Sequence, residues 1–369
     1  MNEGLNAFTN AVQNNNQKPG ACHLKQKERQ NMKIKTSNQS AGLNTCLGLM
    51  LAATVCTTSL PVQAALPDVT RDYTIQTIDV TPPPGGVINE IYCVFINDSG
   101  MVVMQYNSVI GNGSENQGDT AIVKNGVPTI INVPNSAWTG CGNPTACGQV
   151  PLAYADMAGN WHSALYHHGT YTYLPDCPPP FQCGVQLIND HLIMTGMAFD
   201  PTGGGWDPVW DWYCVQGVLF NPSLSLFQMF DYPGAYSTYP LGINDADQIV
   251  GTYSSRSDNG VHCFFSDRGK TFVNIDPPGS ANPPDTQTRA AFMINNQGEI
   301  CGYYTDASTG VQEGFLLRRG KFFAFNVPQS SSTAISCITD DGKLSGVYLD
   351  TETPPMPHAF IASPRCDRH

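Results

Sequence analysis

Ile294–Tyr304 reads INNQGEICGYY, and Ile243–Tyr253 reads INDADQIVGTY. Each stretch is followed by a loop, then by a short apolar segment (Glu313–Leu317 and Val261–Phe265), and then by an aromatic-rich run that ends in proline. The chain therefore contains an internal repeat with a period of tens of residues. A period of this length is typical of repeat architectures, so it predicts the fold class more directly than any single strand or turn.

One repeat predicts four short strands, which we name a, b, c and d. The pattern Asn-x-x-Gly, as in Asn295–Gly298, predicts a tight turn, because the Asn side chain hydrogen-bonds the backbone ahead of it and Gly adopts a left-handed conformation. The flanking residues are β-branched and aromatic, as strands require. Arg319-Gly320 marks a second tight turn, and Pro328 ends the last strand because proline cannot donate to a ladder.

The same frame recurs along the chain and predicts a closed ring. The Asx turns begin at positions 96, 155, 188, 243, 294 and 338. The d strands are expected at residues 73–80, 126–133, 169–174, 226–232, 270–276 and 321–327. The chain begins with a lone d strand, Tyr73–Val80, and ends after a c strand, Pro357–Ala362, so the first segment would complete the last blade.

We therefore predict an all-β fold, a six-bladed β-propeller closed by the N-terminal strand, since radial stacking buries faces that single repeats cannot. The alternative is five blades plus an irregular segment, because Ala155–Leu174 has room for little beyond c and d.

The first 64 residues predict a leader rather than a folded part. Residues 1–31 are polar and are expected to be disordered. Met32 opens a secretory signal, with an apolar run at Leu47–Val55 and small residues before a cleavage site near Ala64. A membrane anchor is the alternative, but that run is too short to span a bilayer. Residues 65–369 would then form a single propeller domain, secreted or periplasmic, with no membrane span in the mature chain.

Charge and cysteine content support this compartment. The whole chain has a net charge of −12, and removing the six basic and two acidic residues before position 65 leaves −16. Such a surface argues against a nucleic-acid partner. Ten of the 13 cysteines remain after position 65, an even number that indicates disulfides in an exported chain.

Two local disulfides are predicted from spacing, Cys141–Cys147 and Cys177–Cys183, each within one loop. Metal binding is the rival for these pairs, although zinc sites usually show closer Cys pairs or His partners. The sequence does not choose among the pairings of the other six, which are Cys93, Cys214, Cys263, Cys301, Cys337 and Cys366.

Three equivalent triplets, His358-Ala359-Phe360, His262-Cys263-Phe264 and Glu313-Gly314-Phe315, resemble those of the bacterial extracellular HAF-repeat family. The frame Ile-Asn-x-x-Gly-x-Ile-Val-Gly-Tyr and the closing Ile-Asp-Pro-Pro-Gly are similar to that family too. The resemblance spans roughly residues 73–362 and implies an exported, β-propeller-like repeat protein without an assigned activity. The resemblance implies no catalytic residues in this chain.

The long connections are predicted to gather on one face of the ring. In an up-and-down blade the a–b and c–d turns lie on one face, and the b–c and d–a connections on the other. The long segments, all taken as b–c or d–a connections, are residues 107–118, 136–150, 200–213 and 277–288. Long loops on a rigid scaffold are where binding concentrates.

All five tryptophans lie between positions 138 and 212, with three of them in Gly203–Tyr213. Aromatic faces beside carboxylates suit stacking and hydrogen bonding to a sugar. The predicted ligand-binding residues are Trp206, Asp207, Trp210, Asp211 and Trp212. In the alternative interpretation the tryptophans fill the core of an irregular blade.

No signature of an enzyme is present, neither Gly-x-Ser-x-Gly nor His-Glu-x-x-His nor a phosphate loop. We therefore expect an exported non-enzymatic propeller whose partner is a glycan or an envelope protein. A carbohydrate-active hydrolase or lyase is one alternative, with paired carboxylates drawn from Asp200, Asp207, Asp211 and Asp285. A structural module of the cell envelope is another. No cofactor and no metal site is predicted. Calcium at Asx-rich turns such as Asp245-Ala246-Asp247 is the alternative, although these turns lack the spacing of a known calcium loop. The sequence leaves the oligomeric state open.

Overall fold

The computed structural model describes residues 65–78, 80–81, 86–110, 115–210, 212–281 and 289–365. The predicted leader and signal peptide, residues 1–64, lie outside this part of the chain, as does Cys366. A short 3-10 helix, η1 (Thr70–Asp72), precedes the first strand.

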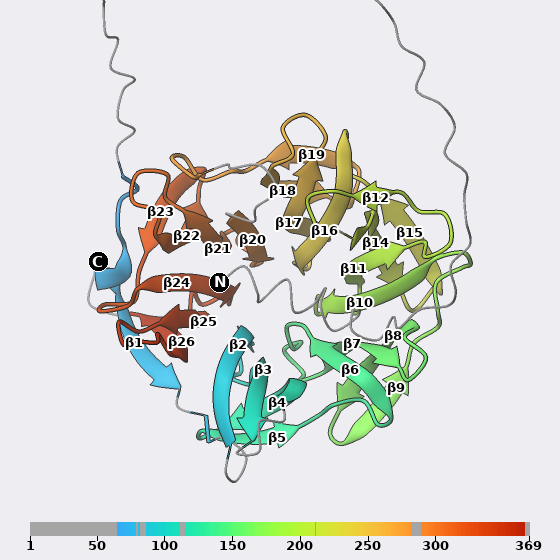
Figure 1. Ribbon diagram of the computed structural model, residues 1–369, viewed down its shortest axis with the longest axis horizontal. Coiled ribbons are helices and arrows are strands. Elements are labelled where there is room, and N and C mark those ends of the chain that lie inside the picture. Colours follow the sequence, from blue (N-terminus) through green and yellow to red (C-terminus); the bar gives the residue numbers. More distant parts are fainter. Residues whose placement is uncertain are drawn as a thin grey trace, which may run out of the picture. The chain divides into compact units, whose positions relative to one another are not determined.

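The described residues form six antiparallel sheets of four strands each, arranged as the blades of a six-bladed β-propeller (Figure 1). The first blade is β2 (Gly86–Ile96), β3 (Val102–Ile110), β4 (Glu115–Lys124) and β5 (Val127–Ile130). The second is β6 (Ser136–Cys141), β7 (Val150–Asp156), β8 (Trp161–His167) and β9 (Thr170–Tyr173). The third is β10 (Gln182–Ile188), β11 (Met194–Phe199), β14 (Val215–Asn221) and β15 (Leu226–Phe230).

The second half of the chain repeats the arrangement. The fourth blade is β16 (Ala235–Ile243), β17 (Gln248–Ser255), β18 (Val261–Asp267) and β19 (Thr271–Asn274). The fifth is β20 (Arg289–Ile294), β21 (Ile300–Thr305), β22 (Gln312–Arg318) and β23 (Lys321–Phe325). The sixth is β24 (Ser332–Ile338), β25 (Leu344–Leu349), β26 (Pro357–Pro364) and β1 (Tyr73–Ile78). A two-stranded sheet, β12 (Trp206–Asp207) with β13 (Trp212–Tyr213), is inserted between β11 and β14.

The ring is closed by the N-terminal strand, as the sequence predicts. β1 pairs antiparallel with β26, from Tyr73 opposite Pro364 to Ile78 opposite Ala359. Figure 1 shows β1, drawn in blue, beside the red strands of the sixth blade. Tyr73 is buried and its ring stands edge-on to Phe325 of the fifth blade, with centroids 5.4 Å apart. The first strand therefore holds two blades together at the closure.

The repeat builds its core from a glycine on strand b and a phenylalanine on strand c. Gly302 lies opposite Phe315 in the ladder, and Phe315 is fully buried. A Cβ at Gly302 would lie 1.9 Å from the Ala290 carbonyl oxygen of strand a and 2.8 Å from the Phe315 ring. Only glycine lets the backbone of strand a and the ring approach strand b from both sides. Gly251 with Phe264 and Gly346 with Phe360 repeat the arrangement.

The turns join each blade to the next around the central axis. Asn244 Nδ2 donates to the Asn295 carbonyl (3.0 Å), and Asn295 Nδ2 donates to the Thr339 carbonyl (3.1 Å). The following residue takes part as well, since Asp340 accepts a hydrogen bond from the Asn296 backbone N–H (2.8 Å). The Asx residues of the repeat thus satisfy buried backbone groups of neighbouring blades, besides making their own turns.

The second blade corrects the sequence prediction. The turn Ala155–Gly159 joins strands β7 and β8, so it is a b–c turn and not the a–b turn that the repeat suggested. The missing a strand is β6, and the a–b connection is Gly142–Gln149. Residues 136–150, predicted as a long b–c or d–a connection, therefore consist of a strand and an a–b loop. The blade count of six is confirmed, and the irregular-segment alternative is wrong.

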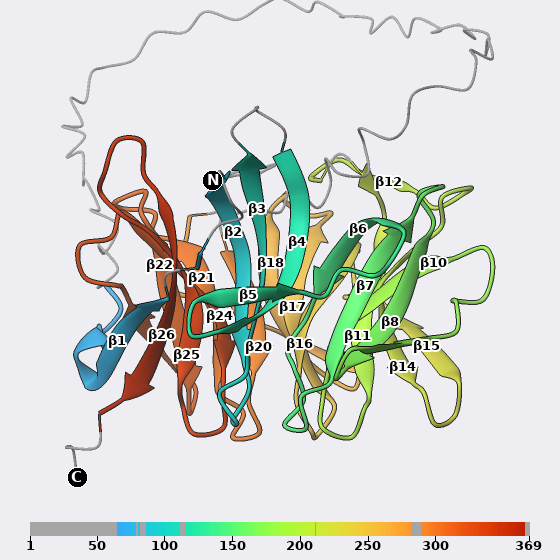
Figure 2. The ribbon, with the colours of Figure 1, turned by 90° about the horizontal axis from the view of Figure 1, so that it is seen from below.

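Each face of the ring carries its own class of connection. Figure 2 shows the a–b turns along the lower edge and the β12 hairpin at the upper edge. We name the first the turn face and the second the long-loop face. The b–c connection 200–213 lies on the long-loop face as predicted, whereas the a–b loop of the second blade, with Cys147, lies on the turn face.

Candidate functional site

The hairpin β12–β13 is the aromatic feature that the long-loop face presents to solvent. Trp206 pairs with Tyr213 and Asp207 with Trp212 across the two strands. The Trp206 side chain is 55% exposed, and its ring stands edge-on to Tyr213 with centroids 6.2 Å apart. An exposed indole on a hairpin gives a flat apolar face with a polar edge, which suits stacking against a ring-shaped ligand.

The other two tryptophans of the hairpin region pack inward. Trp210 stands edge-on to Tyr239 at 5.2 Å, and Trp212 lies 6.1 Å from Phe199. Both are half-buried against a cluster that contains Trp138. Trp210 and Trp212 thus fill the space above the third blade, as the alternative interpretation of the sequence has it, and Trp206 alone of the three is exposed.

Asp207 is fully buried, which corrects its predicted role as a ligand contact. Its Oδ1 accepts a hydrogen bond from the Val209 N–H (2.9 Å), and its Oδ2 accepts one from the Ser254 hydroxyl (2.5 Å). Ser254 Oγ in turn accepts from the Ser237 N–H (3.0 Å), and Ser237 Oγ accepts from the Val215 N–H (3.0 Å). The carboxylate therefore fastens the hairpin to the fourth blade. Asp211 lies outside the described residues.

A second aromatic side chain and a cation lie next to the hairpin. The Arg256 guanidinium lies over the Tyr236 ring, 4.3 Å from its centroid, and its Nε donates to the Ala235 carbonyl (2.8 Å). Burial, the largest cause, raises the pKa of the nearby Cys214 thiol, and the Arg256 charge opposes that change. Because the Cys214 N–H donates to the Gly205 carbonyl (2.8 Å), the cation sits beside the base of the hairpin.

One carboxylate adds to this group. Asp231, at the end of strand d of the third blade, accepts a hydrogen bond from Gln216 Nε2 (2.6 Å). Burial raises its pKa, although the Gln216 bond and the Arg256 charge oppose that change. We name Trp206, Tyr213, Tyr236, Arg256 and Asp231 the hairpin site. It offers ring faces, a cation and a hydrogen-bonding carboxyl at one border between blades.

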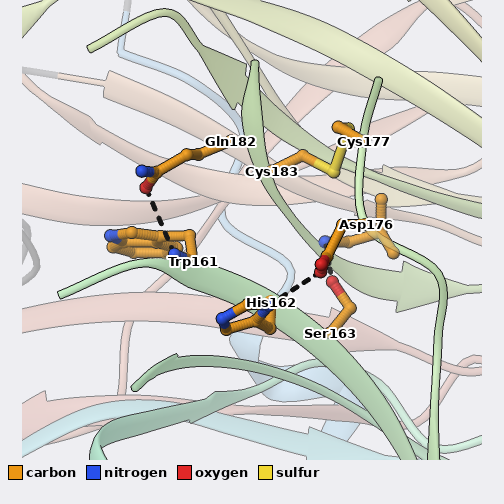
Figure 3. Close-up of a disulfide and its surroundings, with 8 residues drawn as sticks. Trp161, His162, Ser163, Asp176, Cys177, Gln182 and Cys183 are labelled. Carbon is orange, nitrogen blue, oxygen red and sulfur yellow. Dashed lines mark hydrogen bonds and ion pairs between the residues drawn. A yellow bond between two sulfur atoms is a disulfide. The ribbon is translucent and has the colours of Figure 1, made fainter. Parts of the chain in front are cut away.

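The Cys177–Cys183 pair is a disulfide, with a Cα–Cα distance of 5.9 Å. Figure 3 shows it beside strand β8, where His162 Nδ1 is hydrogen-bonded to Asp176 Oδ1 (2.7 Å) and Gln182 reaches the Trp161 N–H (3.2 Å). The bridge ties strand a of the third blade to the segment that follows β9, and it fixes Asp176 next to His162.

The predicted Cys141–Cys147 disulfide is wrong, because both thiols are free. Cys141 is the last residue of β6 and is buried, whereas Cys147 is exposed on the a–b loop of the turn face. The prediction treated residues 136–150 as one loop, and a strand end occupies its first half.

Pairs of histidine and aspartate on the long-loop face are the polar groups that the sequence interpretation missed. His262 Nδ1 is hydrogen-bonded to Asp276 Oδ2 (2.6 Å), and its Nε2 to Asp258 Oδ2 (3.0 Å). Asp276 also pairs with Arg289, whose Nη1 lies 2.8 Å away and whose side chain is nearly fully buried. His162 and Asp176 repeat the first pair at the same spacing of 14 residues.

The charges in this group stabilise one another. The hydrogen bond that His262 donates to Asp276 raises the pKa of His262 above its ordinary value, against the opposing effect of burial. Burial would raise the pKa of Asp276, but His262 and Arg289 together hold it below its ordinary value. The His262 ring also stacks on Tyr253, with centroids 5.2 Å apart. Because every charge in the group has a partner, and Arg289 comes from strand a of the fifth blade, the group is best explained as the fastening of strands c and d of the fourth blade to each other and to the fifth blade.

The turn face has a small cavity where the a–b turns meet at the axis. Its volume is about 80 Å³, room for a few water molecules and well below a drug-sized pocket of roughly 300 Å³ or more. Its rim carries the second Asx residue of each regular turn, which are Asp98, Asp190, Asp245, Asn296 and Asp340. These side chains accept backbone N–H bonds from neighbouring turns, so they are occupied in joining blades.

In the part of the chain that the structure covers, no helix has the length and apolar character to cross a bilayer. Among the same residues, no group of three or more His, Cys, Asp or Glu side chains is arranged to hold a metal ion.

No protein-family model and no curated protein matches the chain. Similar solved structures include the β-propeller domain of the Trilobed protease from Pyrococcus furiosus, at 11% identity and a TM-score of 0.40, over 76% of this chain and 95% of that one. TolB from Acinetobacter baumannii is similar at 11% identity and a TM-score of 0.39, over 76% of this chain and 64% of that one. An oligogalacturonate lyase from Vibrio parahaemolyticus is similar at 8% identity and a TM-score of 0.38, over 79% and 97%. Similarities at this level carry no argument about activity or ligand.

Proposed function

We propose that this propeller is an exported, non-enzymatic binding protein of the HAF-repeat type that takes a carbohydrate ligand on the hairpin site of its long-loop face. The observation that carries the proposal is the 55% exposure of Trp206, on a hairpin whose other tryptophans pack inward. The buried Asp207 fastens the hairpin to the fourth blade, so the Trp206 ring has a fixed place at the surface.

The chemistry around Trp206 favours a sugar. An indole face stacks on the apolar face of a sugar ring, while hydroxyl groups need donors and acceptors at the edge. Tyr213 supplies a second ring, and Arg256 and Asp231 supply a donor and an acceptor within the same site. Covering about 100 Å² of the indole contributes about 2.5 kcal/mol at 25 cal/mol per Å².

Two observations favour binding over hydrolysis. A glycoside hydrolase needs two carboxylates that face each other across the scissile bond. Of the four predicted candidates, Asp207 is buried, and Asp200 turns back to accept the Thr202 and Gly203 N–H groups (2.8 and 3.2 Å). Asp211 and Asp285 lie outside the described residues.

The Cys177–Cys183 disulfide supports export, since such bridges persist in oxidising compartments.

A binding screen tests the proposal. The chain from residue 65 would be titrated by calorimetry against a panel of neutral and acidic polysaccharides, and the best ligand then measured on variants. Trp206→Ala is expected to weaken binding about 10- to 50-fold, which corresponds to roughly 1.4–2.4 kcal/mol. Tyr173→Ala is the matched control, because Tyr173 is 56% exposed on the outermost strand of the second blade. Absence of binding to every polysaccharide, or equal losses in both variants, would refute the proposed site.

A further inference from the structure

Positive charge is scarce on the long-loop face. Among the residues that the structure describes, only two lysines or arginines lie at the long-loop ends of strands, Arg256 after β17 and Arg289 at the start of β20. Arg289 is buried and pairs with Asp276 (2.8 Å). The other described basic residues lie at the turn-face ends of strands, as Lys124 and Lys270 do. Arg256, which is exposed, is therefore the cation that this face offers to a ligand.

Most of the other charged side chains described on this face are acidic. They lie in the connections that follow strands b and d, and they include Asp176, Asp258, Asp306, Asp350 and Glu352. Such a surface repels a ligand with many negative charges, whereas a single negative group is attracted to a cation beside it. The charge pattern thus favours a ligand whose one anionic group lies at Arg256.

The Arg256 guanidinium is held in one orientation before any ligand arrives. It lies over the Tyr236 ring, 4.3 Å from the centroid, and its Nε donates to the Ala235 carbonyl (2.8 Å). The Arg256 backbone N–H donates to the Gly234 carbonyl (3.2 Å). The guanidinium makes no ion pair within the described part of the chain, so the edge with its two Nη groups is open to a carboxylate. A fixed guanidinium binds a planar carboxylate through two parallel hydrogen bonds at a low ordering cost.

The cation and the exposed indole belong to one connected piece of structure. Asp207 follows Trp206 in the hairpin and accepts a hydrogen bond from the Ser254 hydroxyl. Ser254 precedes Arg256 by two residues. Strand β12 packs against β16, which carries Tyr236 (Figure 1). A sugar ring stacked on Trp206 therefore leaves the guanidinium within reach of a carboxylate on the same ring or on the adjoining one.

We propose that Arg256 makes the hairpin site specific for an oligosaccharide with one carboxylate, a terminal uronic acid on an otherwise neutral chain. The inference rests on the carbohydrate binding proposed above and names the class of sugar. A ring of the terminal part of the chain stacks on Trp206, and the carboxylate accepts two hydrogen bonds from Arg256. A chain made only of uronic acids binds less well, because its remaining carboxylates lie along the acidic face.

The test compares neutral tetrasaccharides of glucose and of galactose with the same chains ending in one uronic acid, and with chains oxidised to uronic acid at every residue. Dissociation constants would be measured by calorimetry on the chain from residue 65, in which the ring is complete. In low salt the chain with one terminal acid should bind about fivefold more tightly than the neutral chain. The fully oxidised chain should bind no more tightly than the neutral one. At about 0.5 M NaCl the preference should fall below about twofold.

Variants separate the role of the cation from that of the indole. Arg256→Gln should bind the neutral chain and the chain with one acid equally, while Arg256→Lys, which keeps the charge but not the planar fork, should keep about a twofold preference. Lys270→Gln removes the same charge from the turn face, so it is the matched control and should bind as the parent does. Trp206→Ala should weaken the binding of both chains by the same factor, because the indole contacts the ring and not the carboxylate.

Three results would overturn the inference and leave the Trp206 site standing. They are equal affinities of the parent for the neutral chain and the chain with one acid, a preference that survives Arg256→Gln, and an equal loss of preference in Lys270→Gln. A parent that binds none of the tetrasaccharides would overturn the hairpin site together with the inference.

Discussion

Asp207 is the residue whose substitution tests most sharply how the hairpin site is held. Asp207→Ala removes the acceptor of two buried donors, the Val209 N–H and the Ser254 hydroxyl. Each buried donor left without a partner costs about 1–3 kcal/mol, and relief of the buried charge offsets part of that. We expect the free energy of unfolding to fall by about 3 kcal/mol. Asp207→Asn keeps one acceptor and the shape, so a loss of about 1 kcal/mol is expected.

Equilibrium urea unfolding, followed by circular dichroism, measures these losses. Hydrogen exchange of the Val209 and Cys214 amides reports the hairpin directly, because Cys214 N–H is bonded across its base. A double-mutant cycle with Ser254→Ala should give a coupling of about 1–2 kcal/mol. Asp200→Ala, at the start of the same connection, is the control and should leave the hairpin amides protected. An Asp207→Ala variant within about 0.5 kcal/mol of the parent, with unchanged exchange, would refute the anchoring role.

Three further predictions address the blades. The pKa of His262 is raised in the folded protein, so its contribution to the free energy of unfolding is complete below the ordinary histidine pKa of about 6.5 and is lost as pH rises. The pKa of Asp276 is lowered, so its contribution is complete above the ordinary aspartate pKa of about 3.9 and is lost as pH falls. Urea midpoints should therefore show the largest gap between the parent and His262→Gln between about pH 4 and 6.5, and a gap that grows towards pH 8.5 would contradict this. Gly302→Ala places a Cβ 1.9 Å from a backbone oxygen, so the free energy of unfolding should fall by several kcal/mol or the chain should not fold. Gly310→Ala, at φ +70° in open space, should lower it by about 1–2 kcal/mol. Equal thermal midpoints for the two variants would be evidence against the packing described. Phe360→Ala, in the strand that receives β1, should cost about 3–5 kcal/mol in urea unfolding, and a loss below about 1 kcal/mol would show that the closure is not packed as described.

The regular blades were predictable because their local chemistry and their packing agree. The Asx turn, the b-strand glycine and the c-strand phenylalanine all specify one blade, as Gly302 with Phe315 shows. The partner of the first strand, Tyr73–Ile78, was predictable as well. The chain begins with a d strand that has no blade and ends with a blade that has no d strand, so the two ends complete each other.

The second blade was misassigned because similar turns occur on both faces. Asp156 to Gly159 has the composition of an a–b turn, yet it connects b to c. The true a strand, β6, ends in Cys141, where the a strands of the other five blades end in isoleucine. The Cys141–Cys147 pairing failed for the same reason, since spacing along the chain does not reveal that one of the two residues ends a strand.

The division of roles within the hairpin depends on tertiary packing that the sequence does not express. Trp206 and Trp212 occupy similar local contexts, but Phe199 of β11 covers Trp212 and leaves Trp206 exposed. The His262–Asp276 pair left a usable signal, because its spacing of 14 residues recurs at His162–Asp176. Aligning the c and d strands of all repeats would have found it.

The most direct test of carbohydrate binding at the hairpin is an NMR titration of the indole N–H signals. The chain has five tryptophans, so each can be assigned by single substitution. On addition of a binding polysaccharide fragment, the Trp206 signal should shift while those of the packed Trp138 and Trp161 stay in place. A bound ligand that leaves the Trp206 signal unmoved would contradict the account.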